Sequence, residues 1–289
     1  GDIGLIMARR LTWEGAKVEA VLEILPFPSG LTRNIVQCLN DQGIPLYLSH
    51  TVVDIHGEER VEGVTVARVD GNLRPIPGTE WDIECDTLLL SVGLIPENEL
   101  TQDVGGELDH VTGGPVVTDE METSTPGIFA CGNVVHIHDL VDNVTREAWT
   151  AGEGAARLVA GQQPGGDTVR TRAGDGIRYV VPHVLHLDNL ASRDVRLFMR
   201  ATRPAERVQV EAVVGGEVVF SKFERVVRPA EMVMLTIPAG KVSPGKMGPN
   251  RARLNKVSPD CADGGPQPEL VVRITPRDRD SAAEGGEKA

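Results

Sequence analysis

Residues 1–24 read GDIGLIMARRLTWEGAKVEAVLEI, and this stretch decides the class of fold. Apolar residues recur at helical spacing over Gly4–Trp13, which predicts a helix, and Val18–Ile24 follows it as a strand. The alternation continues with a helix over Leu31–Asp41 and a strand over Ile44–Ser49. Because helices alternate with strands in this way, we predict an α/β fold built on a parallel, doubly wound sheet.

Residues 51–92 predict a different local arrangement. Three β-prone runs, Thr51–His56, Val61–Val69 and Leu73–Cys85, are separated by turn signals. This spacing predicts a small antiparallel meander inserted in the α/β domain. The continuous apolar run Thr87–Val92 then predicts a strand at the centre of the parallel sheet, buried on both faces.

The second half of the chain divides into an α/β part and an all-β part. Short strands are expected at Pro115–Thr118 and Gly127–Cys131, and a helix over Val144–Ala160. Beyond about Gln162 the runs are those of strands, and Gly215-Gly216 supplies a two-residue hairpin turn. We therefore expect a small, sandwich-like all-β domain, then a tail whose last ~14 residues are disordered. The strand-like runs are Arg178–Leu185, Arg193–Ala201, Val208–Val214, Glu217–Phe223, Met232–Ile237 and, within the tail, Glu269–Thr275.

The composition argues against several classes of protein. The net charge of −13 over 289 residues argues against nucleic acid as a partner, and no apolar run is long enough to span a membrane. The four cysteines form no CxxC pair, so they lack the spacing of zinc, iron–sulfur or dithiol sites and favour a reducing cytoplasm. The chain opens at Gly1, inside a motif and without an initiator Met or a signal peptide, so we expect it to be a fragment.

Gly1-Asp2-Ile3-Gly4 is the first segment with a chemical signature. It fits the last four positions of GxGxxG, where Gly1 lets the backbone approach a pyrophosphate and the helix N-terminus supplies free N–H groups. Glu23 ends the following strand, where a carboxylate accepts hydrogen bonds from ribose hydroxyls and repels a 2′-phosphate, which favours NAD over NADP. The alternatives are a loop glycine pair before a helix and a solvated strand-end carboxylate.

Two further segments place glycine at the end of an apolar run. Asp86–Pro96 contains Gly93 and Pro96 at the carboxyl edge where α/β sheets bind ligands, although a plain exit from strand to turn has the same pattern. Thr123–Val134, TSTPGIFACGNV, is the strongest signal, because a turn feeds a short strand that ends in Gly132-Asn133. This glycine lets a ligand approach the backbone, and the neighbouring amide offers both a donor and an acceptor.

In this order and spacing the three segments resemble the pyridine nucleotide-disulfide oxidoreductase superfamily, over about residues 1–240. The resemblance implies a Rossmann-like NAD-binding domain, the remaining part of an FAD-binding domain, and FAD and NAD as cofactors. Arg146-Glu147-Ala148 resemble the start of the family's last flavin helix, whose N-terminus faces the isoalloxazine ring. The cofactor-binding residues that the resemblance implies are Gly1, Asp2, Ile3, Gly4, Glu23, Gly93, Pro96, Gly132, Asn133, Val134, His138, Arg146, Glu147 and Ala148.

The sequence departs from the family pattern at two places. Asn133 stands where the family usually has Asp, so it would bind the ribityl chain without a charge. The C-terminal part differs from the usual dimerisation domain. Ile177–Pro182 and Arg228–Met232 are similar instead to accessory FAD/NAD subunits of amine-, opine- or glycerol-phosphate-type dehydrogenases.

A loop beside the expected flavin carries His136, His138, Asp139 and Asp142. These residue types are metal ligands, but we predict no metal site here. The loop either covers the flavin, with His138 or Asp139 reaching it or a substrate, or is ordinary solvated polarity. No pattern identifies a catalytic acid, base or nucleophile, and Cys131 is expected to be a core residue.

These observations predict four regions and one activity. Residues 1–107 are expected to be a NAD-binding domain truncated at its N-terminus, 108–165 the end of an FAD-binding domain, 166–240 an all-β domain and 241–289 an extended tail. We expect an FAD/NAD(P)-dependent oxidoreductase that transfers hydride equivalents between NAD(H) and bound flavin. Its partner would be a small-molecule redox substrate or a companion dehydrogenase subunit, and oligomerisation stays open.

Two other functions stay open at this point. The chain is alternatively a non-catalytic, partner-binding subunit, or a disulfide reductase whose CxxC lies upstream of Gly1. We also expect the 289-residue product to purify without yellow colour, because the segment that would grip the ADP half of FAD is absent from it.

Overall fold

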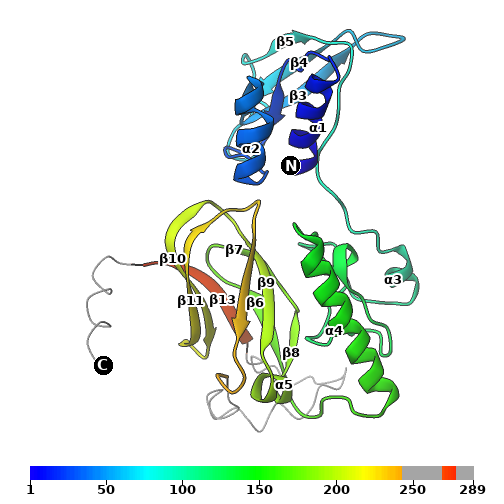
Figure 1. Ribbon diagram of the computed structural model, residues 1–289, viewed down its shortest axis with the longest axis vertical. Helices are drawn as coiled ribbons and strands as arrows, with labels where there is room; N and C mark the ends of the chain where they lie inside the picture. Colours follow the sequence, from blue (N-terminus) through cyan, green and yellow to red (C-terminus); the bar gives the residue numbers. More distant parts are fainter. Residues whose placement is uncertain (243–268, 278–289) are drawn as a thin grey trace. The chain divides into compact units, whose positions relative to one another are not determined.

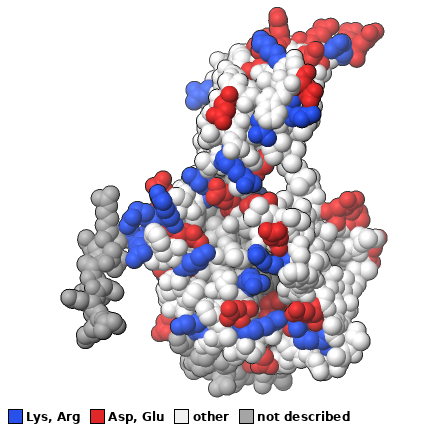
Figure 2. Space-filling view, in the orientation of Figure 1, with Lys and Arg blue, Asp and Glu red and all other residues white. Residues whose placement is uncertain are grey.

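The structure, a computed structural model, describes residues 1–242 and 269–277 and divides into two compact units (Figure 1). The first unit is Gly1–Gly93 and the second is Leu94–Ala289. The expected disorder of the last residues falls on positions outside the described part of the chain. No helix among the described residues is both long and apolar enough to cross a membrane. Acidic and basic side chains are interspersed on the face shown in Figure 2.

The first unit confirms the predicted alternation of helices and strands. Its elements are α1 (Asp2–Trp13), β1 (Val21–Glu23), α2 (Thr32–Cys38), a 3-10 helix (Asn40–Gln42) and β2 (Leu46–Leu48). Strands β1 and β2 pair in parallel, with Val21 opposite Leu46. A small core of Leu5, Ala8, Cys38, Leu39 and Ile44 holds the helices and strands together. The α/β class of the fold is therefore confirmed.

The predicted meander also forms in the first unit. Strands β3 (His50–His56), β4 (Gly63–Arg68) and β5 (Trp81–Glu84) make a three-stranded antiparallel sheet in that order. Strand β4 is the central one, and it buries Val64 and Val66 while its neighbours stay more exposed. The last strand is shorter than the run Leu73–Cys85 from which it was predicted.

The apolar run Thr87–Val92 does not form the predicted central strand. It has no strand pairing, and Leu90 and Val92 are 74% and 89% exposed. A strand needs a hydrogen-bonded neighbour, and the parallel sheet has only β1 and β2 in the described part of the chain. Instead, the run passes close to the first turn of α1. The closeness shows at Gly4, where an added Cβ atom would lie 2.9 Å from Ser91 Cβ.

The second unit begins with a short helix and irregular segments. Helix α3 spans Glu99–Asp103, and helix α4 spans Val141–Val159, beginning earlier than predicted. The expected strands Pro115–Thr118 and Gly127–Cys131 form only isolated bridges, such as Val117 with Thr123. The buried apolar residues here are Val117, Met121, Val135, Ala151, Tyr179 and Val181, the last two from the β domain.

The rest of the second unit is the predicted β sandwich (Figure 1). One sheet has the order β11-β10-β13-β6-β8 and the other β12-β9-β7. The run Arg178–Leu185 is divided into two strands at Pro182, whereas β6 and helix α5 were not predicted. The elements are β6 (Thr168–Ala173), β7 (Ile177–Val181), β8 (Val184–His186), α5 (Leu187–Ser192), β9 (Val195–Ala201), β10 (Ala205–Val214), β11 (Glu217–Val227), β12 (Met232–Ile237) and β13 (Glu269–Pro276).

The sandwich contains the largest hydrophobic core of the described residues. Alternate residues of β10 point into it, since Val208, Val210, Ala212 and Val214 are all buried. Strands that pack one face against a second sheet show this period of two. Other fully buried members are Leu185, Leu190, Leu197, Met199, Leu235, Ile237 and Leu270.

Candidate functional site

The N-terminal motif lies at the start of α1. Gly1 is the N-cap residue, no side chain caps the helix, and open space surrounds the position of a Cβ atom at Gly1. The first N–H groups of this helix are therefore available to an anion. Ile3 is exposed. Asp2 turns aside to accept hydrogen bonds from Leu31 N at 2.8 Å and Asn34 Nδ2 at 2.7 Å.

Glu23 ends β1 as predicted, and its carboxylate holds the loop that follows. One oxygen accepts from Leu25 N at 3.1 Å, and the other accepts from both the N–H and the hydroxyl of Ser29. A ribose would therefore share this carboxylate with the loop. Gly93 closes the first unit with a φ of +107°, and Pro96 lies in the second unit beside Gly113.

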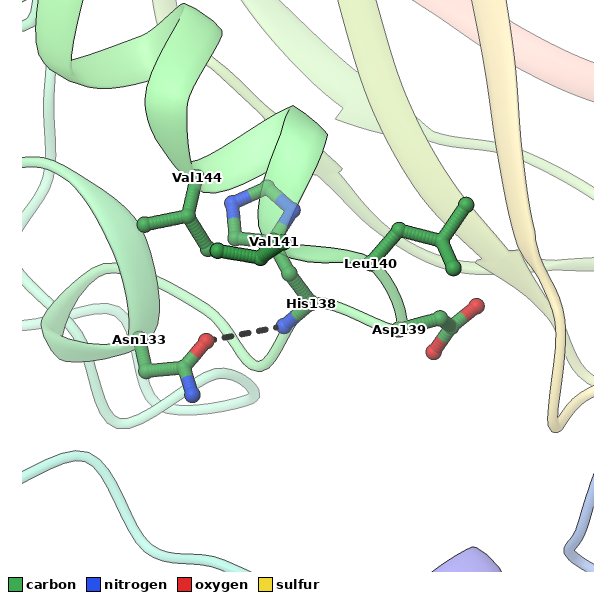
Figure 3. Close-up of a pocket in the computed structure, with 6 residues that line it drawn as sticks. All are labelled: Asn133, His138, Asp139, Leu140, Val141 and Val144. Carbon is green, nitrogen blue, oxygen red and sulfur yellow. Dashed lines mark hydrogen bonds between the residues drawn. The ribbon is translucent and has the colours of Figure 1, made fainter.

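A pocket of about 390 Å³ lies where α4 begins (Figure 3). Gly132 has a φ of +75° and starts a 3-10 helix over Gly132–Val134, which turns the chain at the edge of this pocket. The Oδ1 atom of Asn133 accepts a hydrogen bond from the backbone N–H of His138 at 3.1 Å. The lining residues are Asn133, His138, Asp139, Leu140, Val141 and Val144.

The N-terminus of α4 opens at this pocket without a side-chain cap. Its N-cap residue is Leu140, and Val141 is 74% exposed. The mouth of the pocket therefore combines apolar side chains with the free N–H groups and the positive end of the helix dipole. Arg146 and Ala148 lie on the exposed side of the same helix.

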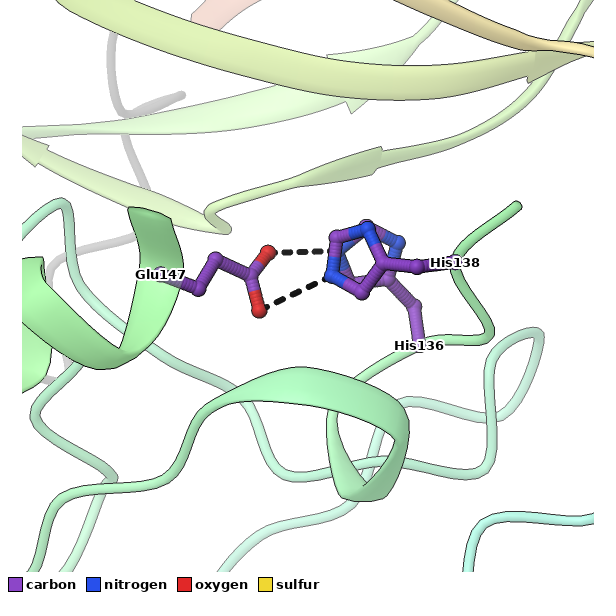
Figure 4. A group of neighbouring side chains, drawn as sticks. All are labelled: His136, His138 and Glu147. Atoms are coloured by element: carbon purple, nitrogen blue, oxygen red, sulfur yellow. Dashed lines mark hydrogen bonds and ion pairs between the residues drawn. The ribbon is translucent and has the colours of Figure 1, made fainter. Parts of the chain in front are cut away.

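Glu147 points to the interior, where it meets two histidines from the loop before the helix (Figure 4). Its Oε1 atom lies 2.7 Å from His136 Nε2 and its Oε2 atom 3.0 Å from His138 Nε2. The second oxygen also accepts a hydrogen bond from Gly132 N at 2.8 Å. All three of these side chains are at most 4% exposed, and Glu147 is not among the residues that line the pocket.

The ionisation of this cluster follows from burial and from its short contacts. Burial alone would raise the pKa of Glu147, but its contacts with His136 and His138 lower that pKa to about 2. Burial lowers the pKa of His136, against the opposing effect of its hydrogen bond to Glu147. The cluster therefore holds an ionised carboxylate against a neutral imidazole at neutral pH.

The β sandwich fixes the loop that carries the histidines. Asp139 accepts a hydrogen bond from Arg200 on β9 at 2.5 Å and from Met232 N on β12 at 2.5 Å. The same arginine also donates to Ile137 O at 3.1 Å. Asp139 is thus a structural ion-pair partner, and it is not part of a ligand cluster with the histidines.

Sequence patterns did not identify the sandwich residues at this site. Arg200 and Phe198 on β9 lie in no motif, and Tyr179 on β7 lies in the run Ile177–Pro182 but was not predicted to reach this site. Phe198 packs on both histidine rings, at centroid distances of 5.7 and 5.5 Å. Only the fold brings these residues together, since they are far from the loop in the chain.

Comparison with known proteins gives a match to one family. The sequence profile described as pyridine nucleotide-disulphide oxidoreductase matches residues 1–154. This range covers α1, β1, the Gly132–Val134 turn and most of α4.

Individual relatives match over about half of the chain. An NADH oxidase from Methanocaldococcus jannaschii is 29% identical over 57% of this chain and 34% of its own length. A glutamate synthase [NADPH] small chain from Halomonas elongata is 31% identical over 43% and 29%, respectively. A dihydrolipoyl dehydrogenase from Pseudomonas aeruginosa is 32% identical over 56% and 33%. The chain therefore spans about a third of the length of these relatives.

Proposed function

The chain belongs to the pyridine nucleotide-disulphide oxidoreductase family, and from this we propose that it is part of an enzyme that transfers hydride equivalents between NAD(H) and bound FAD. The family is one of oxidoreductases. The observation that supports the finer proposal most is the uncapped N-terminus of α4, which opens into a pocket beside the Gly132-Asn133 turn.

The proposed NAD side uses the first unit. The uncapped start of α1 at Gly1 would receive the pyrophosphate, and Gly4 lets the helix lie close to the side chain of Ser91. Glu23, held in place by Ser29, would accept the ribose hydroxyls and disfavour a 2′-phosphate. These roles and the domain limits predicted above are part of the proposal.

The residues around the pocket fit part of a flavin. A volume of about 390 Å³ is in the range of small-molecule sites, and the lining combines the apolar Leu140, Val141 and Val144 with an amide, an imidazole and a carboxylate, those of Asn133, His138 and Asp139. The exposed Leu140 and Val141 would lie against a planar ring, and the helix N-terminus would stabilise negative charge there. When bound, FAD would supply the hydride chemistry, while these residues orient it and exclude water.

The proposal includes a partner and a location. We propose a companion dehydrogenase subunit or a small-molecule redox substrate as the second partner, and a cytoplasmic location. The three cysteines in the described part of the chain are free thiols, which agrees with a reducing compartment.

One observation favours the partner-binding alternative, in which the chain has no flavin chemistry of its own. Asn133, where the family usually has an acid, offers no charge to the ribityl chain.

A pair of substitutions on α4 tests the flavin site in the complete open reading frame that contains this chain. Val141→Glu places a carboxylate at the pocket, where it should repel the anionic edge and phosphates of a flavin. We expect FAD affinity to fall at least about tenfold, which is about 1.4 kcal/mol. The measurement is the flavin absorbance retained after dialysis, together with NADH-dependent bleaching of that absorbance.

Val159→Glu is the matched control, because Val159 is 89% exposed at the opposite end of the same helix. It should retain FAD as the unsubstituted protein does. A colourless complete protein that also fails to take up added FAD would contradict the proposal and favour the partner-binding subunit. A CxxC in the reading frame before Gly1 would instead direct the proposal toward disulfide chemistry.

A further inference from the structure

His136, His138 and Glu147 form a buried group in the second unit, which we call the His–His–Glu cluster (Figure 4). One ligand-type atom from each side chain lies within 4.8 Å of the other two. The histidines come from the loop after the Gly132–Val134 turn and the glutamate from the second turn of α4. The cluster thus joins two short stretches of chain in a single interior position.

The hydrogen bonds within the cluster do not satisfy its histidines. His136 Nε2 has a hydrogen bond to Glu147, but its Nδ1 atom has no partner. His138 Nε2 lies 3.0 Å from Glu147 Oε2 without the direction of a hydrogen bond, and neither ring nitrogen of His138 has a hydrogen-bond partner. The side chain of His138 is only 1% exposed. Buried polar atoms in native proteins are nearly always satisfied, so these nitrogens point to a partner that the other described residues of the chain do not supply.

We propose that the His–His–Glu cluster binds a divalent first-row transition metal ion, Zn²⁺ or Fe²⁺, through the imidazoles of His136 and His138 and the carboxylate of Glu147. Two imidazoles and one carboxylate are the ligand set of several three-ligand sites for these ions. A metal would use His138 Nε2, which has no hydrogen-bond partner among the described residues, and would replace the proton that His136 Nε2 shares with Glu147.

The distances are close to those that an ion needs. Bonds of about 2.1 Å place neighbouring ligand atoms about 3.0–3.4 Å apart in octahedral or tetrahedral geometry. The two nitrogen–oxygen distances to Glu147 are 2.7 and 3.0 Å. An adjustment of a few tenths of an ångström brings both nitrogen–oxygen pairs to these distances, and the third distance, between the two imidazole nitrogens, is within 4.8 Å.

Surrounding groups hold the three ligands in place. Gly132 N donates to Glu147 Oε2 at 2.8 Å, which fixes the carboxylate. Phe198 packs on both imidazoles, and Tyr179 packs on His136 at a centroid distance of 5.8 Å. Such outer contacts orient the ligands of metal sites. The nearby Asp139 is already paired with Arg200, so neither is free to compete for the cluster.

The proposal does not depend on the proposed function. The ligands form their own cluster, and of the three only His138 also lines the pocket beside α4. A chain that binds metal without FAD, or FAD without metal, would separate the two proposals.

Metal titration of the 289-residue chain tests the proposal after dialysis against EDTA. We expect one equivalent of Zn²⁺ to bind by calorimetry, and Co²⁺ to develop visible d–d absorption as it enters a low-symmetry nitrogen and oxygen site. His138→Gln and Glu147→Gln should each weaken Zn²⁺ binding at least about 100-fold, more than the 10–100-fold typical of outer-shell changes. Circular dichroism checks that each variant is folded, and His138→Gln decides the question if Glu147→Gln does not fold.

His110→Gln is the matched control, because the His110 side chain is 92% exposed and outside the cluster. It should bind Zn²⁺ as the unsubstituted chain does. Equal binding by His138→Gln and the unsubstituted chain would overturn the proposal, as would loss of binding in His110→Gln alone. A near-ultraviolet thiolate band with Co²⁺ would place the ion on cysteine and would also overturn it.

Discussion

Asp119 and His186 form a buried ion pair between an irregular segment and the end of β8. The Nδ1 atom of His186 lies 2.6 Å from Asp119 Oδ1, and Asn189 donates to the other oxygen at 2.8 Å. Burial opposes both charges, but the pair interaction prevails. It lowers the pKa of Asp119 below 3.8 and raises the pKa of His186 above 6.5. The pair is therefore a pH-dependent source of stability.

The direction of this dependence follows from the two shifts. The contribution of His186 is complete below pH 6.5, and it is lost as the pH rises through the raised pKa of the folded protein. The contribution of Asp119 is present above pH 3.8, and it is lost as the pH falls through the lowered pKa. The pair stabilises the fold most between these two values.

His186→Gln should therefore destabilise the second unit more at pH 6 than at pH 9. We expect the difference in free energy of unfolding between the two proteins to shrink by about 1.5 kcal/mol over this range, as a charged hydrogen bond becomes neutral. Urea unfolding at both pH values measures it. Comparing the variant with the unsubstituted chain at each pH cancels the contributions of the other titrating groups. An equal loss of unfolding free energy at both pH values would contradict the charged pair of His186 and Asp119.

Sequence patterns predicted part of the candidate site and missed the rest for a physical reason. Gly132, Asn133 and His138 were nominated, and the structure places them together at the pocket or its edge. Which of these residues bind a cofactor stays a prediction. Glu147 was nominated for the flavin, but it faces His136 in the interior. Neither motif nor spacing indicates which face of α4 a side chain occupies when its partners come from a loop.

At the scale of elements, helix α4 contains two glycines at which substitution by alanine should change the stability of the second unit in opposite directions. A Cβ atom at Gly152 would meet nothing within 4 Å, whereas one at Gly154 would lie 2.6 Å from Glu120 O and 2.9 Å from Phe129 Cε1. Gly152→Ala should stabilise the second unit by about 0.5–1 kcal/mol, because alanine restricts the unfolded chain. Gly154→Ala should destabilise it by about 1–3 kcal/mol through overpacking.

Thermal unfolding of the two variants measures both effects with the same helix and the same substitution. If Gly154→Ala were as stable as Gly152→Ala, the close packing of α4 on Glu120 would be wrong.

The strands could be predicted from the sequence where apolar residues alternate with polar ones along the chain, and less well elsewhere. The limits of β12 were predicted correctly, and those of β9 and β10 nearly so, because apolar residues recur with a period of two. Strand β6, TVRTRA, was missed because polar and charged residues dominate it. Thr87–Val92 has the composition of a buried strand, but composition does not supply the neighbour that a strand needs.

At the scale of the molecule, the two units have separate cores of unequal size. The first depends on a few residues such as Leu39, and the second on the sandwich core around Leu197. Separate cores favour separate unfolding transitions. Leu39→Ala should lower only the transition of the first unit, and Leu197→Ala only that of the second. Each loss should be about 2–5 kcal/mol, since both side chains are fully buried.

Differential scanning calorimetry of the 289-residue chain distinguishes these outcomes. A single transition that both substitutions lower equally would show that the units unfold together, against this expectation.

The bond of Asp139 to Arg200 and to the backbone of Met232 has an evolutionary consequence. The segment that carries the histidines precedes the sandwich in the chain. The two are joined by Asp139, because both of its carboxylate oxygens accept hydrogen bonds from sandwich strands. Recombination between relatives near residue 165 would separate Asp139 from Arg200. A largely buried charge would then be left without its partner. A replacement sandwich would therefore need an arginine at the position of Arg200 to keep Asp139 paired.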